Sequence, residues 1–311
     1  MRKEPFDRAS WRTHLTAWCA RVLGARPVRT LFEAGWESAV IGLHLENGRD
    51  VVVKLRMAEA RLDGCHRVHR HVHAHGFPCP EPLVAPTPFD NYFATVERYV
   101  VGEELPPSPD RTERFAAALA RLTRTMPAVL AVPSLDPPPG WAWWTHGSRA
   151  LWPPAAEGHV NLNDHPEPPW LMDTATRART RLRLASLPSV VGHTDWQSAH
   201  VRWRNGELAT VYDWDSACAL PEAAIAGLAS VMFAMTEDNP GASLAESSDF
   251  LGAYAIARGH HWTREEQEVA WAAGLWLMAY NAKGETVDNA GGSATALLLA
   301  QQDERLRRAN A

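Results

Sequence analysis

The sequence predicts an α+β protein of two lobes: residues 1–101 with a small antiparallel sheet and one major helix, and residues 102–311, which are mostly helical. Apolar and alternating runs separated by turn signals dominate the first lobe, which is typical of strands. Helical apolar spacing dominates the second lobe. At roughly 150 residues per domain, a chain of 311 residues is long enough for about two domains with substantial cores.

The first lobe begins with an expected amphipathic helix over residues 7–23, in which apolar residues recur at helical spacing. Two strands are expected within 31–45, separated by a turn around Gly35. Asn47-Gly48 is a strong hairpin signal, because these residue types tolerate positive φ. The apolar run 51–55 that follows predicts a third strand.

The major helix of this lobe is expected from about residue 58 to 75, with Gly76 as the residue that ends it. Prolines at 78, 80 and 82 then break the chain, because proline has no backbone N–H to donate. The run 92–100 predicts a further strand, which completes the antiparallel sheet.

The second lobe begins with an expected Ala-rich helix over residues 110–126. Residues 133–169 hold nine of the 23 prolines, so this segment is neither regular helix nor central strand. From about residue 173 we expect a helix, a loop, a hairpin and then several long helices. Thr263, followed three residues later by Glu266, predicts a capping box at the start of one of them.

Composition excludes several classes of protein. The net charge of −5 argues against a dedicated nucleic-acid binder. The longest strongly apolar stretch, 270–280, is too short to span a bilayer, and the N-terminus has no apolar segment of a secretion signal. The four cysteines are scattered, without a CxxC pair. We therefore expect a cytoplasmic protein with no membrane partner.

A hairpin carries the most informative residues. The runs 201–204 and 208–212 are separated by Asn205-Gly206, a second strong hairpin signal. Because a hairpin brings its ends together, Asp195 before the first strand and Asp213 after the second should lie close in space. Two neighbouring carboxylates favour a divalent cation or a shared proton. The alternative is two Asp residues that merely cap loops.

The segments HTDWQSAH (193–200) and VYDWD (211–215) resemble the catalytic and metal-binding loops of the aminoglycoside phosphotransferase family, which is related to the protein kinases. That family has His-x-Asp, an Asn five residues after the Asp, and a second Asp after a short hairpin. The resemblance covers most of the chain. It implies a protein-kinase-like, two-lobed fold and phosphoryl transfer from ATP with Mg²⁺.

The resemblance also implies roles for individual residues. Asp195 would accept the proton of the substrate hydroxyl, His193 would brace the loop, and Asp213 would hold the metal ion. His200 stands where the family has Asn. An imidazole there would ligate the metal and favour Mn²⁺ over Mg²⁺, or would contact phosphate directly. A third interpretation is a degraded, inactive site.

Lys54 is unusual in this chain, because the sequence holds only two other lysines, Lys3 and Lys283, among 31 basic residues. It ends an apolar strand, where a charge is costly without a partner. The resemblance implies that it binds the α- and β-phosphates of ATP, whereas the alternative is a lysine that reaches solvent. The Glu that the family places in the following helix is absent, and the nearest acids, Glu59 and Asp63, lie earlier than the family pattern places them.

Three further residues are implied to bind the nucleotide. The segment 32–38 occupies the place of the loop that covers the phosphates, with Gly35 as its single glycine. Glu97 and Tyr99 lie at the junction of the lobes, where the family's backbone contacts the adenine edge.

Other side chains leave alternatives open. His66, His69 and His73 share one face of the first lobe's helix, which suits a metal site or a lobe interface. Five tryptophans between 141 and 170 would either stack on a substrate ring or pack the proline-rich segment onto its lobe. Acidic residues around 237–249 and 265–268 would suit a cationic acceptor, or are simply solvated helix faces.

The sequence therefore predicts an ATP-dependent O-phosphotransferase that acts on a small, hydroxylated, amine-bearing natural product, such as an aminoglycoside or amino sugar. Two alternatives remain at this point. One is a Ser/Thr kinase of a biosynthetic precursor peptide, and the other is an inactive nucleotide-binding protein.

Overall fold

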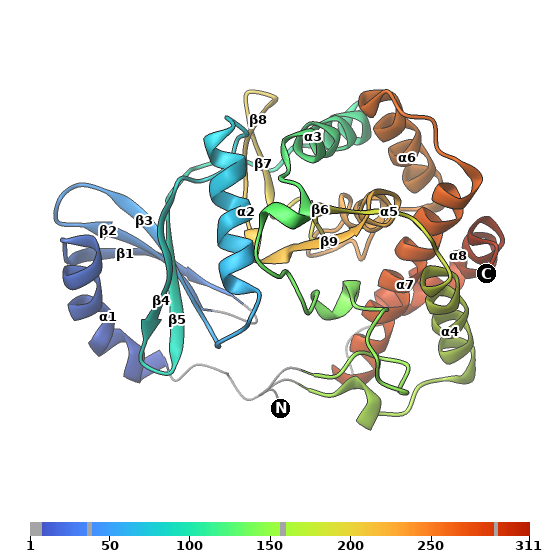
Figure 1. Ribbon diagram of the computed structural model, residues 1–311, viewed down its shortest axis with the longest axis horizontal. Coiled ribbons are helices and arrows are strands. Elements are labelled where there is room, and N and C mark those ends of the chain that lie inside the picture. The colour runs from blue at the N-terminus through green and yellow to red at the C-terminus, as the bar shows by residue number, and fades with distance from the viewer. Residues whose placement is uncertain (1–7, 36–38, 156–159, 289–291) are drawn as a thin grey trace.

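The computed structural model describes residues 8–35, 39–155, 160–288 and 292–311, which form a sheet-rich lobe and a helical lobe side by side (Figure 1). The first lobe holds one five-stranded antiparallel sheet of order β1-β2-β3-β5-β4. Its elements are α1 (Arg8–Leu23), β1 (Pro27–Ala34), β2 (Ala39–Leu45), β3 (Asp50–Arg56), α2 (Leu62–Ala74), β4 (Pro82–Phe89) and β5 (Tyr92–Arg98).

The chain is broken after α2 as predicted, since residues 75–81 are neither helix nor strand, but it then forms a strand, β4, that the sequence did not reveal. β4 pairs with β5 and lies at the edge of the sheet, with register irregularities between Pro82 and Thr87. A proline is tolerated on an edge strand, because its missing N–H can face away from the neighbouring strand. Proline content alone does not reveal whether a strand will be at an edge.

Two hydrophobic cores support the two lobes. The smaller core lies under the sheet and includes Leu15 and Trp18 of α1. The apolar face of α2, with Val68 and Val72, belongs instead to the larger core of the helical lobe. α2 therefore lies between the sheet and the helical lobe (Figure 1) and connects the lobes by its packing.

The helical lobe packs around α5 and α7. Gly227 of α5 lies so close to α7 that an added Cβ would stand 2.0 Å from the carbonyl oxygen of Ala270, so only glycine fits there. The elements of this lobe are α3 (Arg111–Thr125), α4 (Pro169–Arg183), β6 (Ser189–His193), β7 (Val201–Arg204), β8 (Glu207–Val211), β9 (Ala217–Pro221), α5 (Glu222–Met232), α6 (Leu244–Arg258), α7 (Arg264–Asp288) and α8 (Ser293–Ala309).

The hairpin, the capping box and the irregular proline-rich segment predicted for the second lobe are confirmed. β7 and β8 form the predicted hairpin, with positive φ at both Asn205 and Gly206. Thr263 and Glu266 form the capping box of α7, since each backbone N–H donates to the other's side chain, at 2.8 and 3.2 Å. Between α3 and α4 the described chain has only short 3₁₀ helices, as the prolines predict. No helix of the described ranges has the length and apolar character needed to cross a membrane.

Candidate active site

A pair of strands that the sequence did not reveal positions the two predicted loops. β6 pairs antiparallel with β9, so that His193 lies opposite Ala217. The loop after β6 carries Asp195, and the loop before β9 carries Asp213. The β6–β9 pair and the β7–β8 hairpin therefore hold both loops from two sides.

His193 connects these loops from beneath. Its side chain is fully buried, and its Nε2 donates to the carbonyl oxygen of Tyr212 at 2.8 Å while its Nδ1 accepts from the N–H of Asp195 at 3.3 Å. Burial lowers the pKa of His193, so the ring is neutral at pH 7. The predicted bracing role agrees with this geometry, in which His193 supports the loop but does not extend into the site.

Asp195 is buried, with 8% of its surface exposed. One carboxylate oxygen, Oδ1, accepts from Nε2 of Gln197 at 2.7 Å, and Oδ2 lies 3.2 Å from Nδ1 of His200. Gln197 was not among the predicted residues, and its position two places after Asp195 was the only signal for it. The two partners fix the orientation of the carboxylate.

Asp213 adopts a left-handed backbone conformation, with φ 60° and ψ 52°. Such a conformation is uncommon for a residue with a side chain and often occurs at functional sites. Its carbonyl oxygen accepts from both the N–H and the Oγ of Ser216. Burial alone would raise the pKa of Asp213, but the nearby cations His200, Arg56 and Lys54 hold it well below its usual range.

Asp195, His200 and Asp213 come together as predicted. One potential ligand atom of each lies within 4.8 Å of the others, and no other group of three or more His, Cys, Asp or Glu residues does so among the described residues. Two carboxylates and an imidazole suit a divalent cation such as Mg²⁺ or Mn²⁺. The residues present therefore fit a metal ion at this site.

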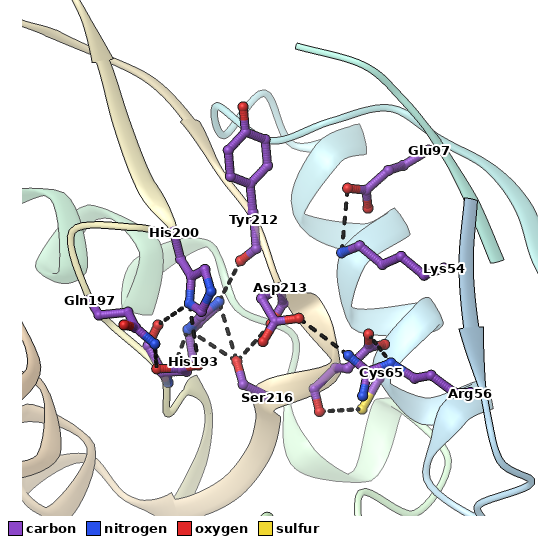
Figure 2. A network of polar contacts seen from close by, with 12 residues as sticks. Lys54, Arg56, Cys65, Glu97, His193, Gln197, His200, Tyr212, Asp213 and Ser216 are labelled. Carbon is purple, nitrogen blue, oxygen red and sulfur yellow. Dashed lines mark hydrogen bonds and ion pairs between the residues drawn. The ribbon is translucent and has the colours of Figure 1, made fainter. Parts of the chain in front are cut away.

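His200 lies close to both carboxylates and also contacts the backbone oxygen of Asp195 at 3.2 Å; Figure 2 shows it beside Asp213. Burial alone would lower its pKa, but Asp195 and Asp213 raise the pKa of His200 to about 9. In the metal-free protein the ring is therefore an imidazolium ion at neutral pH.

Lys54 has a partner that the sequence did not reveal. Its Nζ lies 3.4 Å from Oε1 of Glu97, and both side chains are less than a tenth exposed. Glu97 comes from the adjacent strand β5 rather than from α2 (Figure 2). Burial raises the pKa of Glu97, and the attraction of Lys54 only partly offsets this effect. Its carboxyl group thus faces Lys54, whereas the family resemblance implies only that its backbone contacts the adenine edge.

The histidine-rich face of α2 contributes to the lobe interface. The ring of His69 stacks on Trp214, with centroids 5.2 Å apart, and its Nε2 donates to the carbonyl oxygen of Pro80 at 2.7 Å. Burial lowers the pKa of His69 well below its usual value. His66 and His73 do not form a metal-ligating cluster with it, and the interface interpretation is the one that the contacts favour.

The junction of the lobes lies next to the site, because Tyr212, which precedes Asp213, contacts Val100 there. Tyr99 follows β5, and its ring contacts that of Phe32 on β1 with centroids 5.5 Å apart. The hydroxyl of Tyr212 donates to the carbonyl oxygen of Val100. Gly35 has a φ of 116°, which favours glycine, while residues 36–38 of the expected phosphate loop lie outside the described residues.

The tryptophans of the proline-rich segment have two different roles. Trp144 and Trp152 are buried in the large core, with 2% and 1% exposed, so they pack the segment onto its lobe. Trp141 is half-buried, and its Nε1 donates to the carbonyl oxygen of Thr194 at 3.0 Å. This hydrogen bond places Trp141 beside the residue that precedes Asp195.

The two acidic stretches also differ in their surroundings. Glu266 caps α7, and Glu268 pairs with Arg181 at 2.9 Å, so the later stretch is structural. Glu237 and Asp238 are exposed in the loop after α5. That loop lies beside the 193–200 loop, because Oγ of Ser198 donates to the carbonyl oxygen of Met235 at 3.3 Å.

Comparison with known proteins agrees with this geometry. Residues 28–276 match the sequence profile of the phosphotransferase enzyme family, and no curated protein matches the chain.

Among solved structures the chain is similar in fold to amicoumacin kinase hAmiN in complex with AMP-PNP, Ca²⁺ and Ami, with a TM-score of 0.64 at 11% identity over 96% of this chain and 93% of that chain. It is also similar to a thermostable mutant of aminoglycoside phosphotransferase APH(4)-Ia in a ternary complex with AMP-PNP and hygromycin B (TM-score 0.61, 16% identity, 94% of this chain and 98% of that chain covered). A third is a choline/ethanolamine kinase family protein from Mesorhizobium loti (0.54, 16%, 96% and 94%). The predicted two-lobed, protein-kinase-like fold is thereby confirmed.

Proposed function

The chain belongs to the phosphotransferase enzyme family, and within it we propose an ATP-dependent O-phosphotransferase that acts on a small, hydroxylated, amine-bearing molecule. The observation that carries the proposal is the group of Asp195, His200 and Asp213, whose ligand atoms lie within 4.8 Å of one another. Lys54 stands opposite this group at the junction of the lobes (Figure 2). Phosphoryl transfer depends mainly on such positioning and on charge neutralisation.

The nucleotide would bind between the lobes. Lys54 is a compact cation that suits a phosphate group, and its pairing with Glu97 holds it in place. Gly35 would lie over the phosphates, and the backbone around Glu97 and Tyr99 would meet the adenine edge. The AMP-PNP complexes of two proteins of similar fold support ATP as the donor.

Asp213 and His200 would hold the divalent cation, Mg²⁺ or Mn²⁺, with Asp195 nearby. When bound, such an ion neutralises phosphate charge and orients the phosphoryl group. Ligation by His200 would require its neutral form, since a protonated ring nitrogen has no lone pair for a metal.

Asp195 would act on the acceptor. Its carboxylate accepts the proton of the acceptor hydroxyl as the oxygen bonds to the γ-phosphorus, and the bond from that phosphorus to the β-γ bridging oxygen breaks to release ADP. Gln197 fixes the carboxylate through its 2.7 Å hydrogen bond. His193 positions the loop from beneath.

The surroundings of Asp195 support a cationic acceptor. Glu237 and Asp238 are exposed in the loop that contacts the catalytic loop at Ser198, and they offer negative charge to an amine. Trp141 is hydrogen-bonded to Thr194 and adds an aromatic side chain, which suits a cationic group.

ADP release, screened across aminoglycosides, amino sugars, amines and peptides in Mg²⁺ and in Mn²⁺, tests the proposal. We expect turnover with an amine-bearing small molecule. Asp195→Asn should lower kcat by about 10²- to 10⁴-fold, the usual range for a lost general base, and should leave the Kd for AMP-PNP within twofold. The substitution is nearly isosteric, so Gln197 retains its partner.

Three outcomes would contradict the proposal. Turnover with peptides alone would make the protein a peptide kinase. Nucleotide binding without ADP release on any acceptor would point to an inactive nucleotide-binding protein. An unchanged kcat in Asp195→Asn would remove Asp195 from the chemistry.

A further inference from the structure

Arg56 is a second cation on the same strand as Lys54. It is the last residue of β3, and side chains two positions apart in a strand point to the same face. Figure 2 shows both side chains extending from β3 toward Asp213. Neither the sequence patterns nor the roles assigned above include Arg56.

Two carboxylates hold Arg56 unequally. Its Nε lies 2.6 Å from Oδ2 of Asp215, whereas its Nη2 lies 3.3 Å from Oδ1 of Asp213. The first contact is a short ion pair without hydrogen-bond alignment, whereas in the second the Nη2 donates a long hydrogen bond. Asp215 is therefore the closer ionic partner of Arg56, and Asp213 accepts its longer hydrogen bond.

We propose that Arg56 binds the β- and γ-phosphates of the nucleotide together with Lys54, anchored throughout by Asp215. Its contact with Asp213 is then a resting contact, which ends when a divalent cation and the nucleotide bind. The proposal rests on the function proposed above. It assigns to this chain a phosphate-binding arginine two residues beyond the lysine.

The charges around Asp213 explain why Arg56 should exchange its contact with Asp213 for a contact with phosphate. A divalent cation and a guanidinium on the same carboxylate repel each other strongly at such short range. The triphosphate brings several negative charges into the same space. Because Asp215 keeps the Nε, the guanidinium can turn its Nη2 from Asp213 to a phosphate oxygen without any movement of β3.

The ion pair between Lys54 and Glu97 explains why a second cation is useful for phosphate binding. Lys54 is already paired with Glu97 at 3.4 Å, so part of its charge is compensated before the nucleotide arrives. Arginine presents a planar fork of donors that matches phosphate oxygens. The pair of Lys54 and Arg56 thus supplies both a point charge and a fork from one strand.

A purely structural role is the competing explanation. Arg56 comes from the first lobe and the 213–215 loop from the second, so the ion pairs also connect the lobes. A structural connection would change the melting temperature by the same amount with and without ligand. A phosphate-binding residue changes nucleotide affinity specifically.

The experiment compares Arg56→Met and Arg56→Lys with wild type and with a control, Arg181→Met. The control breaks an ion pair with Glu268 in the helical lobe, where the N–O distance is 2.9 Å and both side chains are 12% exposed. Calorimetry gives the Kd for AMP-PNP with Mg²⁺. Electron paramagnetic resonance gives the Kd for Mn²⁺ without nucleotide, and thermal unfolding reports folding.

We expect Arg56→Met to weaken AMP-PNP binding by about 10- to 100-fold, the loss of one charge-assisted contact. The same variant should bind Mn²⁺ alone severalfold more tightly, because the competing cation on Asp213 is gone. Arg56→Lys should keep charge but lose the fork, and should fall between Arg56→Met and wild type in AMP-PNP affinity. Arg181→Met should change only the melting temperature.

An AMP-PNP affinity in Arg56→Met equal to that of wild type overturns the inference, as does weaker Mn²⁺ binding. If Arg56→Met fails to fold, Arg56→Lys decides, and wild-type AMP-PNP affinity in it overturns the inference. Wild-type protein that binds no AMP-PNP overturns the proposed function itself, which is a different failure from an effect missing only at Arg56.

Discussion

His200 lies close to two carboxylates, and this position has a consequence for stability. Its pKa is raised from 6.5 to about 9 in the folded protein, because Asp195 and Asp213 outweigh the cost of burial. A raised pKa stabilises the folded state below the unfolded value and loses that contribution as pH rises through the folded value. The contribution is thus present below pH 6.5 and lost toward pH 9 and above.

We expect the metal-free wild-type protein, in EDTA, to lose about 3 kcal/mol of stability from this group between pH 6.5 and 9. His200→Asn lacks the titration, and the other groups largely cancel when the two proteins are compared. Chemical unfolding at pH 6, 7.5 and 9 measures the difference. A wild-type minus variant difference that does not change with pH would contradict the raised pKa.

At the scale of elements, the proline-rich segment is attached to α7 through Lys283. This lysine is fully buried, and its Nζ donates to the carbonyl oxygen of His165 and to the carboxylate of Glu167. Trp152 donates to the same carboxylate from its Nε1 at 3.4 Å. The pair anchors the segment whose Trp141 stands beside the catalytic loop.

Lys283→Met should destabilise the protein by about 3–5 kcal/mol, because it leaves Glu167 as an uncompensated charge. The double variant Lys283→Met with Glu167→Gln should recover part of the loss, since no unpaired charge remains. Thermal unfolding of both variants measures this. Equal stability of single and double variants would show that the charge of Glu167 is not the cause.

At the scale of the whole molecule, the β7–β8 hairpin packs against the chain that joins the lobes. Glu103 and Trp203 exchange two backbone hydrogen bonds of 2.8 Å, and Arg204 donates to the carbonyl oxygen of Val101 at 2.6 Å. Tyr212 donates to the carbonyl oxygen of Val100. A ligand between the lobes would therefore contact parts that are already held together.

AMP-PNP with a divalent cation should raise the melting temperature, because a ligand selective for the folded state stabilises it by about 2.7 kcal/mol at a hundredfold excess over Kd. Differential scanning fluorimetry measures the shift. Lys54→Met combined with Glu97→Gln should reduce it without leaving an unpaired buried charge. The absence of any wild-type shift in both Mg²⁺ and Mn²⁺ would refute the nucleotide site.

The sequence by itself determined the features that depend on short stretches of chain. Asn205-Gly206 specified the hairpin, because those residue types adopt positive φ at little cost, and the hairpin placed Asp195 near Asp213. The capping box of Thr263 and Glu266 also follows from local hydrogen bonding. In a chain of only three lysines, Lys54 stood out by its residue type alone, and the same signal would have pointed to Lys283.

Only the tertiary structure decided which distant groups meet. Glu97 replaced the expected helix partner of Lys54 because β5 lies next to β3, and Arg56 reached Asp213 and Asp215 across the lobe junction. The 82–89 strand tolerates its prolines because it lies at the sheet edge. Spacing along the chain encodes local geometry, whereas these contacts depend on how two separately built lobes pack, and a Coulomb interaction depends on the resulting distance in space.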